Sequence, residues 1–263
     1  MSTLAREPYS ECPREDQVIR GEGAGVRAER VLVWTVPAVL AAALILGLVV
    51  SPPDALQGQT VRLMYLHVPA AVLAYLAFAV AAAASAGYLI RRDLAWDRRA
   101  RAAAELGVGF TALTLAEGSL WARPTWGVFW VWDPRLVATA LLLLVFLGYL
   151  AARRLSAGPH VTARRAAVIA LAGFVVVPVD HFSVEWWPSV HQTDDIRIED
   201  PRMLAALAAA VTAFALLACW MYLRRLRVLT ARAADVAIPP AALPVPGAAA
   251  EAAEPVTTTA GRR

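Results

Sequence analysis

The sequence predicts an all-α integral membrane protein with six transmembrane helices and both termini in the cytoplasm. Two observations support this fold class. Of the 263 residues, 59% are hydrophobic, and the mean hydropathy is +0.54, which is more than a soluble domain of this length can bury. The hydrophobic residues also gather into six long apolar segments, and a helix of about 20 apolar residues is long enough to cross a bilayer.

These six segments supply the predicted helices. They cover residues 31–50, 64–90, 102–120, 136–152, 164–180 and 203–223. The fifth has the shortest apolar core and contains Pro178 near its end, but it keeps the arginine-rich C-terminal flank on the same side as the other arginine clusters. One membrane domain, 31–223, is thus expected between two disordered cytoplasmic tails, polar residues 1–30 and Ala/Pro-rich residues 224–263.

The arginines predict the orientation of the helices. All 25 basic residues are arginine, and twenty of them lie in the tails or in the connections on one side. The other five are Arg62, Arg123, Arg135, Arg197 and Arg202. Because cytoplasmic loops carry the excess of basic residues, the connections near 51–66, 121–135 and 181–202 are expected on the outer face of the membrane.

Residues 121–135 form the most unusual of these outer connections. Tryptophan is large and flat, so several in one short stretch favour a membrane interface or a flat partner. In an extended chain Trp126, Trp130 and Trp132 would face one side, whereas in a helix Trp126 and Trp130 would stack and Trp132 would turn away. Asp133 and the proline after it predict a helix start. Six of the nine tryptophans lie on the outer side: Trp121, Trp126, Trp130, Trp132, Trp186 and Trp187.

Three of the four histidines also lie on the outer side: His67, His181 and His191. His67 and His191, together with the tryptophans, suggest a flat ligand held through nitrogen. Haem fits, because its iron takes imidazole on both faces and its propionates pair with arginines such as Arg123 or Arg135. An imidazole must be neutral to bind iron, which its ordinary pKa of about 6.5 allows. Two axial histidines favour holding and passing haem over oxygen chemistry.

Each of these residues also has a purely structural explanation. Single interfacial tryptophans form belts, a histidine at a helix end is often just hydrogen-bonded, Asp133 can be only a helix cap, and arginines extend to lipid headgroups. Glu105 and Glu117, in or near the third segment, are functional candidates because carboxylates in membranes are costly. Cys12 and Cys219 form no CxxC motif, so no thiol chemistry is expected.

Residues 126–136 resemble the tryptophan-rich signature of the haem-handling membrane proteins of cytochrome c maturation; they read Trp-Gly-Val-Phe-Trp-Val-Trp-Asp-Pro-Arg-Leu. Within that superfamily the chain is most similar to the haem exporter protein C (CcmC) family. It has six predicted spans, His67 precedes Val-Pro-Ala-Ala, and His191 follows Phe-Ser-Val-Glu-Trp-Trp at 182–187. Val137 stands where the signature usually has threonine, so a local hydrogen bond is expected to be absent.

The resemblance implies that the protein holds haem b as transient cargo at the outer face and loads it onto the periplasmic haem chaperone CcmE. It implies His67 and His191 as axial ligands of the iron, and His181, close to the same motif, competes for the second position. The implied platform for haem and chaperone is Trp126, Trp130, Trp132 and Asp133. The other expected haem contacts are Trp121, Arg123, Arg135, Trp186 and Trp187. Implied partners are CcmD, the ABC-type pair CcmA and CcmB, and membrane lipid, with no nucleic acid.

Three other functions stay open at this level. A transmembrane haem transporter or channel needs polar or ligating residues within the spans, where alanine, leucine and valine dominate. A structural subunit that only recruits CcmE would carry no haem, and a quinone-linked redox protein could share a tryptophan-rich interface. No nucleophile or acid–base pair stands out, so enzyme status is undecided: any ligase-like role would come from positioning the reactants.

Overall fold

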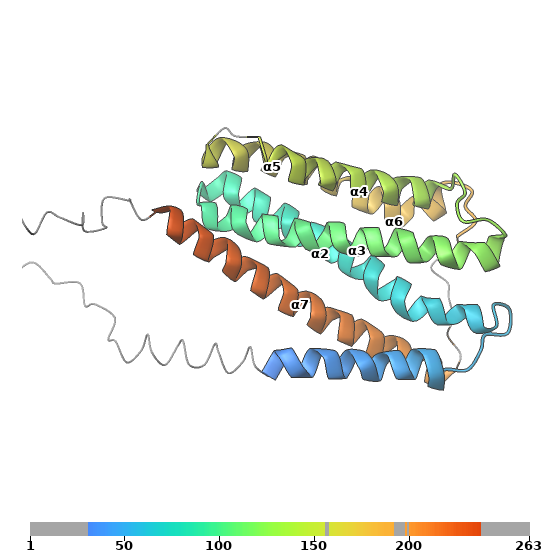
Figure 1. Ribbon diagram of the computed structural model, residues 1–263. Helices are drawn as coiled ribbons and strands as arrows, with labels where there is room; N and C mark the ends of the chain where they lie inside the picture. Colours follow the sequence, from blue (N-terminus) through green and yellow to red (C-terminus); the bar gives the residue numbers. More distant parts are fainter. Residues whose placement is uncertain (1–30, 156–157, 192–197, 199, 238–263) are drawn as a thin grey trace, which may run out of the picture.

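Long helices lying side by side form the protein in a computed structural model (Figure 1), which describes residues 31–155, 158–191, 198 and 200–237. Among these residues no strand occurs, only an isolated bridge between Asp54 and Gly58. The all-helical prediction is therefore confirmed for this part of the chain. The predicted tail 1–30 and residues 238–263 of the other tail lie outside the described residues.

The described residues form a succession of helical elements. A first helix over residues 31–45 continues as the π-helical turn η1 (Leu46–Val50), and the 3-10 turn η2 (Gln59–Leu63) leads into α2 (Met64–Arg91). The remaining helices are α3 (Leu94–Trp126), α4 (Pro134–Ala152), α5 (Pro159–Phe174), α6 (Val176–Trp186) and α7 (Pro201–Ala237).

Five helical stretches among the described residues are long and apolar enough to cross a membrane. They are Val31–Val50, Gln59–Arg91, Pro134–Ala152, Pro159–Trp186 and Pro201–Asp235. The helix α3 is long, but it is less apolar because it carries Glu105 and Glu117 along its length. Six membrane crossings and cytoplasmic termini therefore stay predictions, whereas an integral membrane protein with several apolar helices is what the structure supports.

Several predicted boundaries were wrong. In each case the structure continues a helix into residues that were expected to form a loop or a tail. Helix α3 continues to Trp126, so the tryptophan-rich loop expected over 121–135 is only 127–133. Gly127, with φ of 80°, ends α3 in the left-handed conformation that glycine adopts without strain. The α6 helix extends the fifth segment to Trp186, and α7 runs 14 residues past the expected end at 223.

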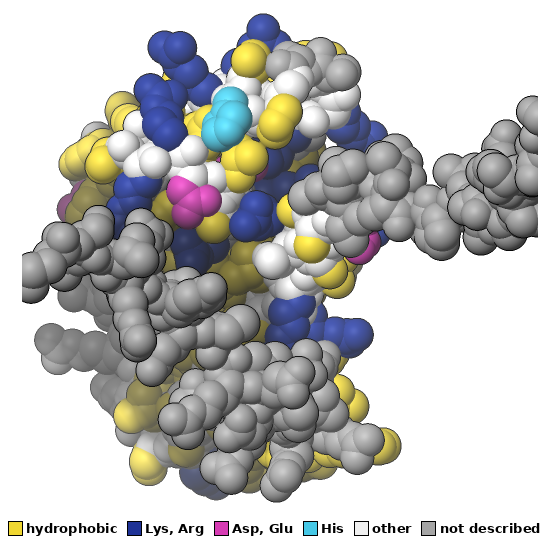
Figure 2. Space-filling model, turned by 90° about the vertical axis from the view of Figure 1, so that its left-hand side faces the viewer, with side chains coloured by type: hydrophobic (Ala, Val, Ile, Leu, Met, Phe, Trp, Pro, Cys, Tyr) yellow, Lys and Arg dark blue, Asp and Glu magenta, His cyan; other side chains and the backbone are white. Residues whose placement is uncertain are grey.

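The two ends of the bundle differ in the segments and side chains that lie there. At one end lie the starts of α2, α4 and α7 together with the ends of α3 and α6 (Figure 1). The opposite end shows a dense cluster of arginine side chains (Figure 2). Two ion-pair networks tie the helices near that end: Arg153 donates to Asp97 Oδ1 at 2.7 Å, and Arg225 donates to Glu105 Oε1 at 2.8 Å.

Small residues let α2 and α3 pack closely around aromatic side chains. The rings of Phe78 and Phe146 stack with their centroids 3.8 Å apart, and both side chains are fully buried. A Cβ at Gly107 of α3 would lie 2.4 Å from the Phe78 ring. Gly107 therefore provides the space in which this aromatic pair sits.

We expect Gly107→Ala to lower the free energy of unfolding by about 1–3 kcal/mol, because Phe78 must shift within a packed core. Gly109→Ala is the matched control on the same helix, since a Cβ there meets nothing within 4 Å. Alanine at 109 should leave stability unchanged or raise it by up to about 1 kcal/mol. Denaturant titration of both variants in detergent, followed by circular dichroism, measures the difference; equal stability would contradict the packing described.

Candidate functional site

The first predicted iron ligand, His67, lies in the first turn of α2 with its imidazole against α3. Its Nδ1 is 3.3 Å from Oε2 of Glu117, and its ring meets Trp121 edge-on with centroids 5.5 Å apart. A Cβ at Gly118 would lie 2.9 Å from the imidazole Cε1, so this glycine makes room for the ring. Trp121 in turn donates its indole N–H to Gln57 at 3.0 Å.

The carboxylate of Glu117 is buried and faces the imidazole of His67. Glu117 is 6% exposed, and neither carboxylate oxygen has a hydrogen-bond donor among the described residues. The His67–Glu117 distance is that of an ion pair, although the angles fall outside hydrogen-bond geometry.

The second predicted ligand, His191, lies just after α6 and contacts Asp133. Its Nδ1 is 3.0 Å from Asp133 Oδ1, and its backbone N–H donates to Ser189 Oγ at 3.0 Å. The ring meets Trp126 edge-on with centroids 5.0 Å apart. Because an ionised carboxylate can only accept, Nδ1 of His191 carries the proton and Nε2 presents its lone pair.

Asp133 joins two segments that are far apart in the sequence. As the N-cap of α4 its Oδ1 accepts from the backbone N–H of Arg135 at 3.0 Å, which confirms the predicted helix cap. Its Oδ2 accepts from the Ser189 hydroxyl at 2.7 Å and from the Val190 N–H at 2.9 Å. Asp133 is 4% exposed, so its carboxylate lies beneath the loop surface.

The surroundings of Asp133 and His191 favour an ionised carboxylate beside a neutral imidazole. Burial alone would raise the pKa of Asp133, but the hydrogen bonds from Ser189 and Val190 and the nearby His191 charge bring it below its ordinary value. Burial lowers the pKa of His191; positive charge at Arg135 and His67 adds to the effect, and Asp133 opposes it. A neutral imidazole is the form that binds a metal.

The two histidines lie at the same end of the bundle. His67 lies in the first turn of α2, and His191 lies five residues after the end of α6 at Trp186. The fold agrees, because the start of α2 and the segment after α6 meet at one end (Figure 1). No group of three or more His, Cys, Asp or Glu that could hold a bare metal ion occurs in the part of the chain described.

The tryptophans of the signature divide into separate groups and do not form one flat shelf. Trp121 lies beside His67 and Trp126 beside His191. Trp130 and Trp132 meet edge-on with centroids 6.0 Å apart in the loop 127–133, and Trp132 is 86% exposed. Neither the extended nor the fully helical alternative is correct, because the helix ends at Trp126 and the loop follows it.

The remaining predicted contacts lie around this centre. Trp186 and Trp187 are half-exposed and meet edge-on at 5.8 Å, with Trp186 on α6 and not in the expected loop. Arg123 donates to the backbone carbonyl of Gly127 and covers the Phe129 ring. Arg135 joins α4 to α6, because it donates to the backbone carbonyl of His181 at 2.8 Å.

His181 belongs to a helix and not to the outer loop in which it was expected. It lies within α6, where its ring meets Tyr75 of α2 at 6.3 Å and Phe182 at 4.9 Å. Its neighbour Asp180 is fully buried and accepts from the hydroxyls of Tyr75 at 3.0 Å and Thr139 at 2.9 Å. The spans are therefore less purely apolar than their composition indicates.

Three residues of the site had no signal in the sequence. Gln57 orients Trp121, Gly118 makes room for His67, and Ser189 binds both Asp133 and the backbone of His191. Their roles depend on contacts between segments up to 64 positions apart, which a one-dimensional pattern does not contain. Glu117 did stand out, because a carboxylate near a span is costly without a role.

Comparison with known proteins adds a family to this geometry. The family model described as "Heme exporter protein C" (CcmC) matches residues 23–237. The Heme exporter protein C of Bradyrhizobium diazoefficiens is 39% identical over 210 residues, which cover 75% of this chain and 78% of that protein. The Heme exporter protein C of Escherichia coli strain K12 is 36% identical over 193 residues, 72% of this chain and 78% of that protein.

A plant relative extends the similarity beyond bacteria. The putative cytochrome c biosynthesis ccmC-like mitochondrial protein of Marchantia polymorpha is 35% identical over 156 residues, which cover 59% of this chain and 66% of that protein. The family match includes every helix of the bundle and both carboxylate–imidazole pairs. From this match, and from relatives that are more than a third identical over most of its length, we conclude that the chain belongs to the heme exporter protein C family.

Proposed function

We propose that this protein binds haem at the outer face of the bacterial inner membrane through His67 and His191 and delivers it to the periplasmic chaperone CcmE for cytochrome c biogenesis. Haem is then cargo and not a resident cofactor. CcmD and the ABC-type pair CcmA and CcmB are the further partners that membership of the family suggests. The contribution of the chain is to position its cargo, and the proposal needs no acid–base catalyst or nucleophile.

One observation carries this proposal: two imidazoles at one end of the bundle each turn Nδ1 toward a buried carboxylate. The distances from Nδ1 are 3.3 Å for His67 to Glu117 and 3.0 Å for His191 to Asp133. Metal-binding histidines characteristically donate their second N–H to such a carboxylate, which fixes the tautomer and increases the basicity of Nε2. Two such Nε2 atoms at one end of the bundle would suit the two axial positions of haem iron.

The aromatic residues suit a flat, apolar cargo. Each proposed ligand has a tryptophan edge-on to its ring, Trp121 for His67 and Trp126 for His191. These indoles provide apolar contact close to the iron position. Arg123 and Arg135 stand at the same end, and each guanidinium has donors beyond the carbonyl that it binds in the structure, so either can pair with a propionate.

Delivery calls for an exposed contact surface, and the loop 127–133 supplies one. Trp132 is 86% and Phe129 55% exposed, and exposed aromatic residues are enriched where proteins bind partners. The same loop ends at Asp133, which holds His191. A chaperone docked on this loop would therefore stand next to a proposed iron ligand.

A transport role has one observation in its favour. Asp180, Tyr75 and Thr139 form a hydrogen-bonded polar cluster between helices, and His181 lies beside it. Such groups within a span are typical of transport pathways. A haem that passes through the bundle would bind His181. Substituting His181 therefore distinguishes transport from haem binding by His67 and His191.

We expect His67→Gly and His191→Gly each to abolish the low-spin, bis-imidazole absorption spectrum of haem in the detergent-purified protein. Added imidazole should restore the spectrum, because a free ring can fill the space that the glycine leaves. The matched controls are His160→Gly, at the arginine-rich end, and His181→Gly. Both variants should keep the bis-imidazole haem spectrum. Loss of the spectrum in His181→Gly alone would favour the transport role and reject His191 as ligand.

We expect Asp133→Asn to weaken haem binding about 10- to 100-fold, since an amide no longer supports the basicity of His191 as a carboxylate does. Asp200→Asn is the control. Like Asp133, Asp200 accepts from a backbone N–H at a helix start, that of Arg202 at 2.7 Å. Its carboxylate pairs with the Arg202 side chain and not with a proposed iron ligand. Haem titration followed at the Soret band gives both affinities. Equal affinities in the two variants would show that the carboxylate does not act on the iron ligand.

We expect Trp132→Ala to reduce transfer of haem to CcmE about tenfold, which is the effect of truncating a residue that contributes strongly to an interface. The affinity for haem should stay within about twofold. Trp34→Ala is the control, because Trp34 is 79% exposed and lies near the start of the first helix, toward the opposite end. Transfer is measured as haem recovered with purified CcmE. Equal transfer by both variants would exclude the loop as the delivery surface.

A further inference from the structure

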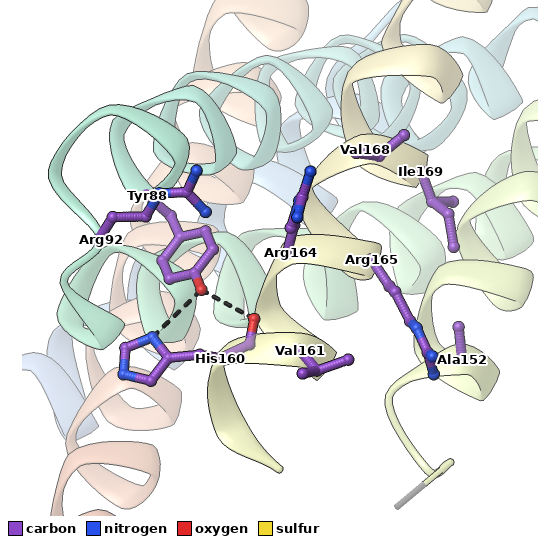
Figure 3. A pocket seen from close by; sticks show the side chains of 9 residues that line it. All are labelled: Tyr88, Arg92, Ala152, His160, Val161, Arg164, Arg165, Val168 and Ile169. Atoms are coloured by element: carbon purple, nitrogen blue, oxygen red, sulfur yellow. Dashed lines mark hydrogen bonds between the residues drawn. The ribbon is translucent and has the colours of Figure 1, made fainter. Parts of the chain in front are cut away.

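A cavity of about 850 Å³ lies at the arginine-rich end of the bundle, far from the histidine site. Residues of α2, α4 and α5 line it (Figure 3). Its wall contains three basic side chains, Arg92, Arg164 and Arg165. The proposed haem function uses none of these residues.

The three arginines line the cavity from two helices. Figure 3 shows Arg92, beside Tyr88 of α2, extending toward Arg164 of α5, whereas Arg165 extends to the opposite side of α5 toward Ala152 of α4. All three are exposed, and in the described part of the chain no carboxylate forms an ion pair with any of them. By contrast, Arg153 and Arg225 nearby are neutralised by Asp97 and Glu105. Positive charge is therefore concentrated at the cavity.

The rest of the cavity wall is apolar and belongs to a membrane-spanning segment. Val161, Val168 and Ile169 lie on α5 within the span Pro159–Trp186. Val161 and Val168 are seven residues apart, so they lie on one face of the helix, and they are 45% and 55% exposed. Val168 and Ile169 follow Arg164 and Arg165 along α5 and so lie farther into the span, whereas Val161 lies nearer the helix start at Pro159.

A buried contact links two of the helices that line the cavity. Tyr88 is 1% exposed, and its hydroxyl donates to the backbone carbonyl of His160 at 2.9 Å. The same oxygen lies 3.3 Å from Nδ1 of His160. This link holds the start of α5 against the end of α2 (Figure 3), so the basic residues from both helices keep their places around the opening.

We propose that this cavity binds an anionic phospholipid of the membrane. The headgroup phosphate binds the guanidinium groups of Arg92 and Arg164, which suit phosphate because each offers two parallel donors. Arg165, on the other side of α5, adds positive charge near the headgroup. An acyl chain lies along Val168 and Ile169. Basic pockets between transmembrane helices near the membrane surface are typical sites for acidic headgroups. A free phosphate would use the arginines alone, and a zwitterionic lipid would bring no net charge to neutralise them.

The test uses the full chain, delipidated in detergent and titrated with dioleoylphosphatidylglycerol under native mass spectrometry. Replacing the three cavity arginines by Arg92→Gln, Arg164→Gln and Arg165→Gln should weaken lipid binding on the order of a hundredfold, from the electrostatic contribution of each arginine. The control carries Arg98→Gln, Arg154→Gln and Arg232→Gln. These arginines lie toward the same end and do not line the cavity, so binding should stay within about threefold.

Two further arms separate the sources of phosphate and test the apolar half. Dioleoylphosphatidylcholine and inorganic phosphate should each bind at least tenfold more weakly than dioleoylphosphatidylglycerol. Val168→Trp, at an exposed position where the fold is not at risk, should reduce lipid binding at least tenfold by filling the acyl groove. Equal losses in the two arginine variants, equal binding of the choline lipid, saturation by phosphate alone, or an unaffected Val168→Trp would each overturn the proposal.

Discussion

The carboxylate of Asp133 is the contact on which the histidine-containing end of this protein depends. It caps α4, accepts hydrogen bonds from Ser189 and Val190, and holds the imidazole of His191. These partners come from two segments about 56 positions apart, and an ionised side chain that is 4% exposed is stable only when such donors surround it. The tryptophan-rich loop and the second histidine are therefore one structural unit.

The two carboxylate–imidazole pairs are built differently, and the difference follows from where they lie. Glu117 and His67 both sit on helices, α3 and α2, so the helix pairing sets their separation, and Gly118 allows the close approach. His191 lies outside any helix and depends on hydrogen bonds for its position. In the proposed haem site, one ligand on a helix and one on a loop would allow one iron contact to stay while the other opens. This property would suit the proposed release of haem.

The bundle separates two chemical environments along its length. One end gathers histidines, tryptophans and carboxylates; the other gathers arginines, partly paired with Asp97 and Glu105 and partly open to the cavity beside α5. In a membrane this polarity would fix the orientation of the chain. Anionic lipid at the arginine-rich end would hold α5 against α2 without any contact to the histidine site, so anchoring and haem handling need not interfere with each other.

The sequence by itself determined the helical membrane class, five of the helical spans, the Asp133 cap, and the aromatic and histidine residues that gather at one end. These features depend on local composition and periodicity, which a single chain displays directly. Only the tertiary structure decided that α3 runs on to Trp126, that His181 belongs to α6, and that Glu117 and Asp133 each face a histidine. The physical reason is that helix ends and side-chain pairs are set by contacts between distant segments: Ser189 with Asp133, Gly118 with His67, and Tyr75 with Asp180.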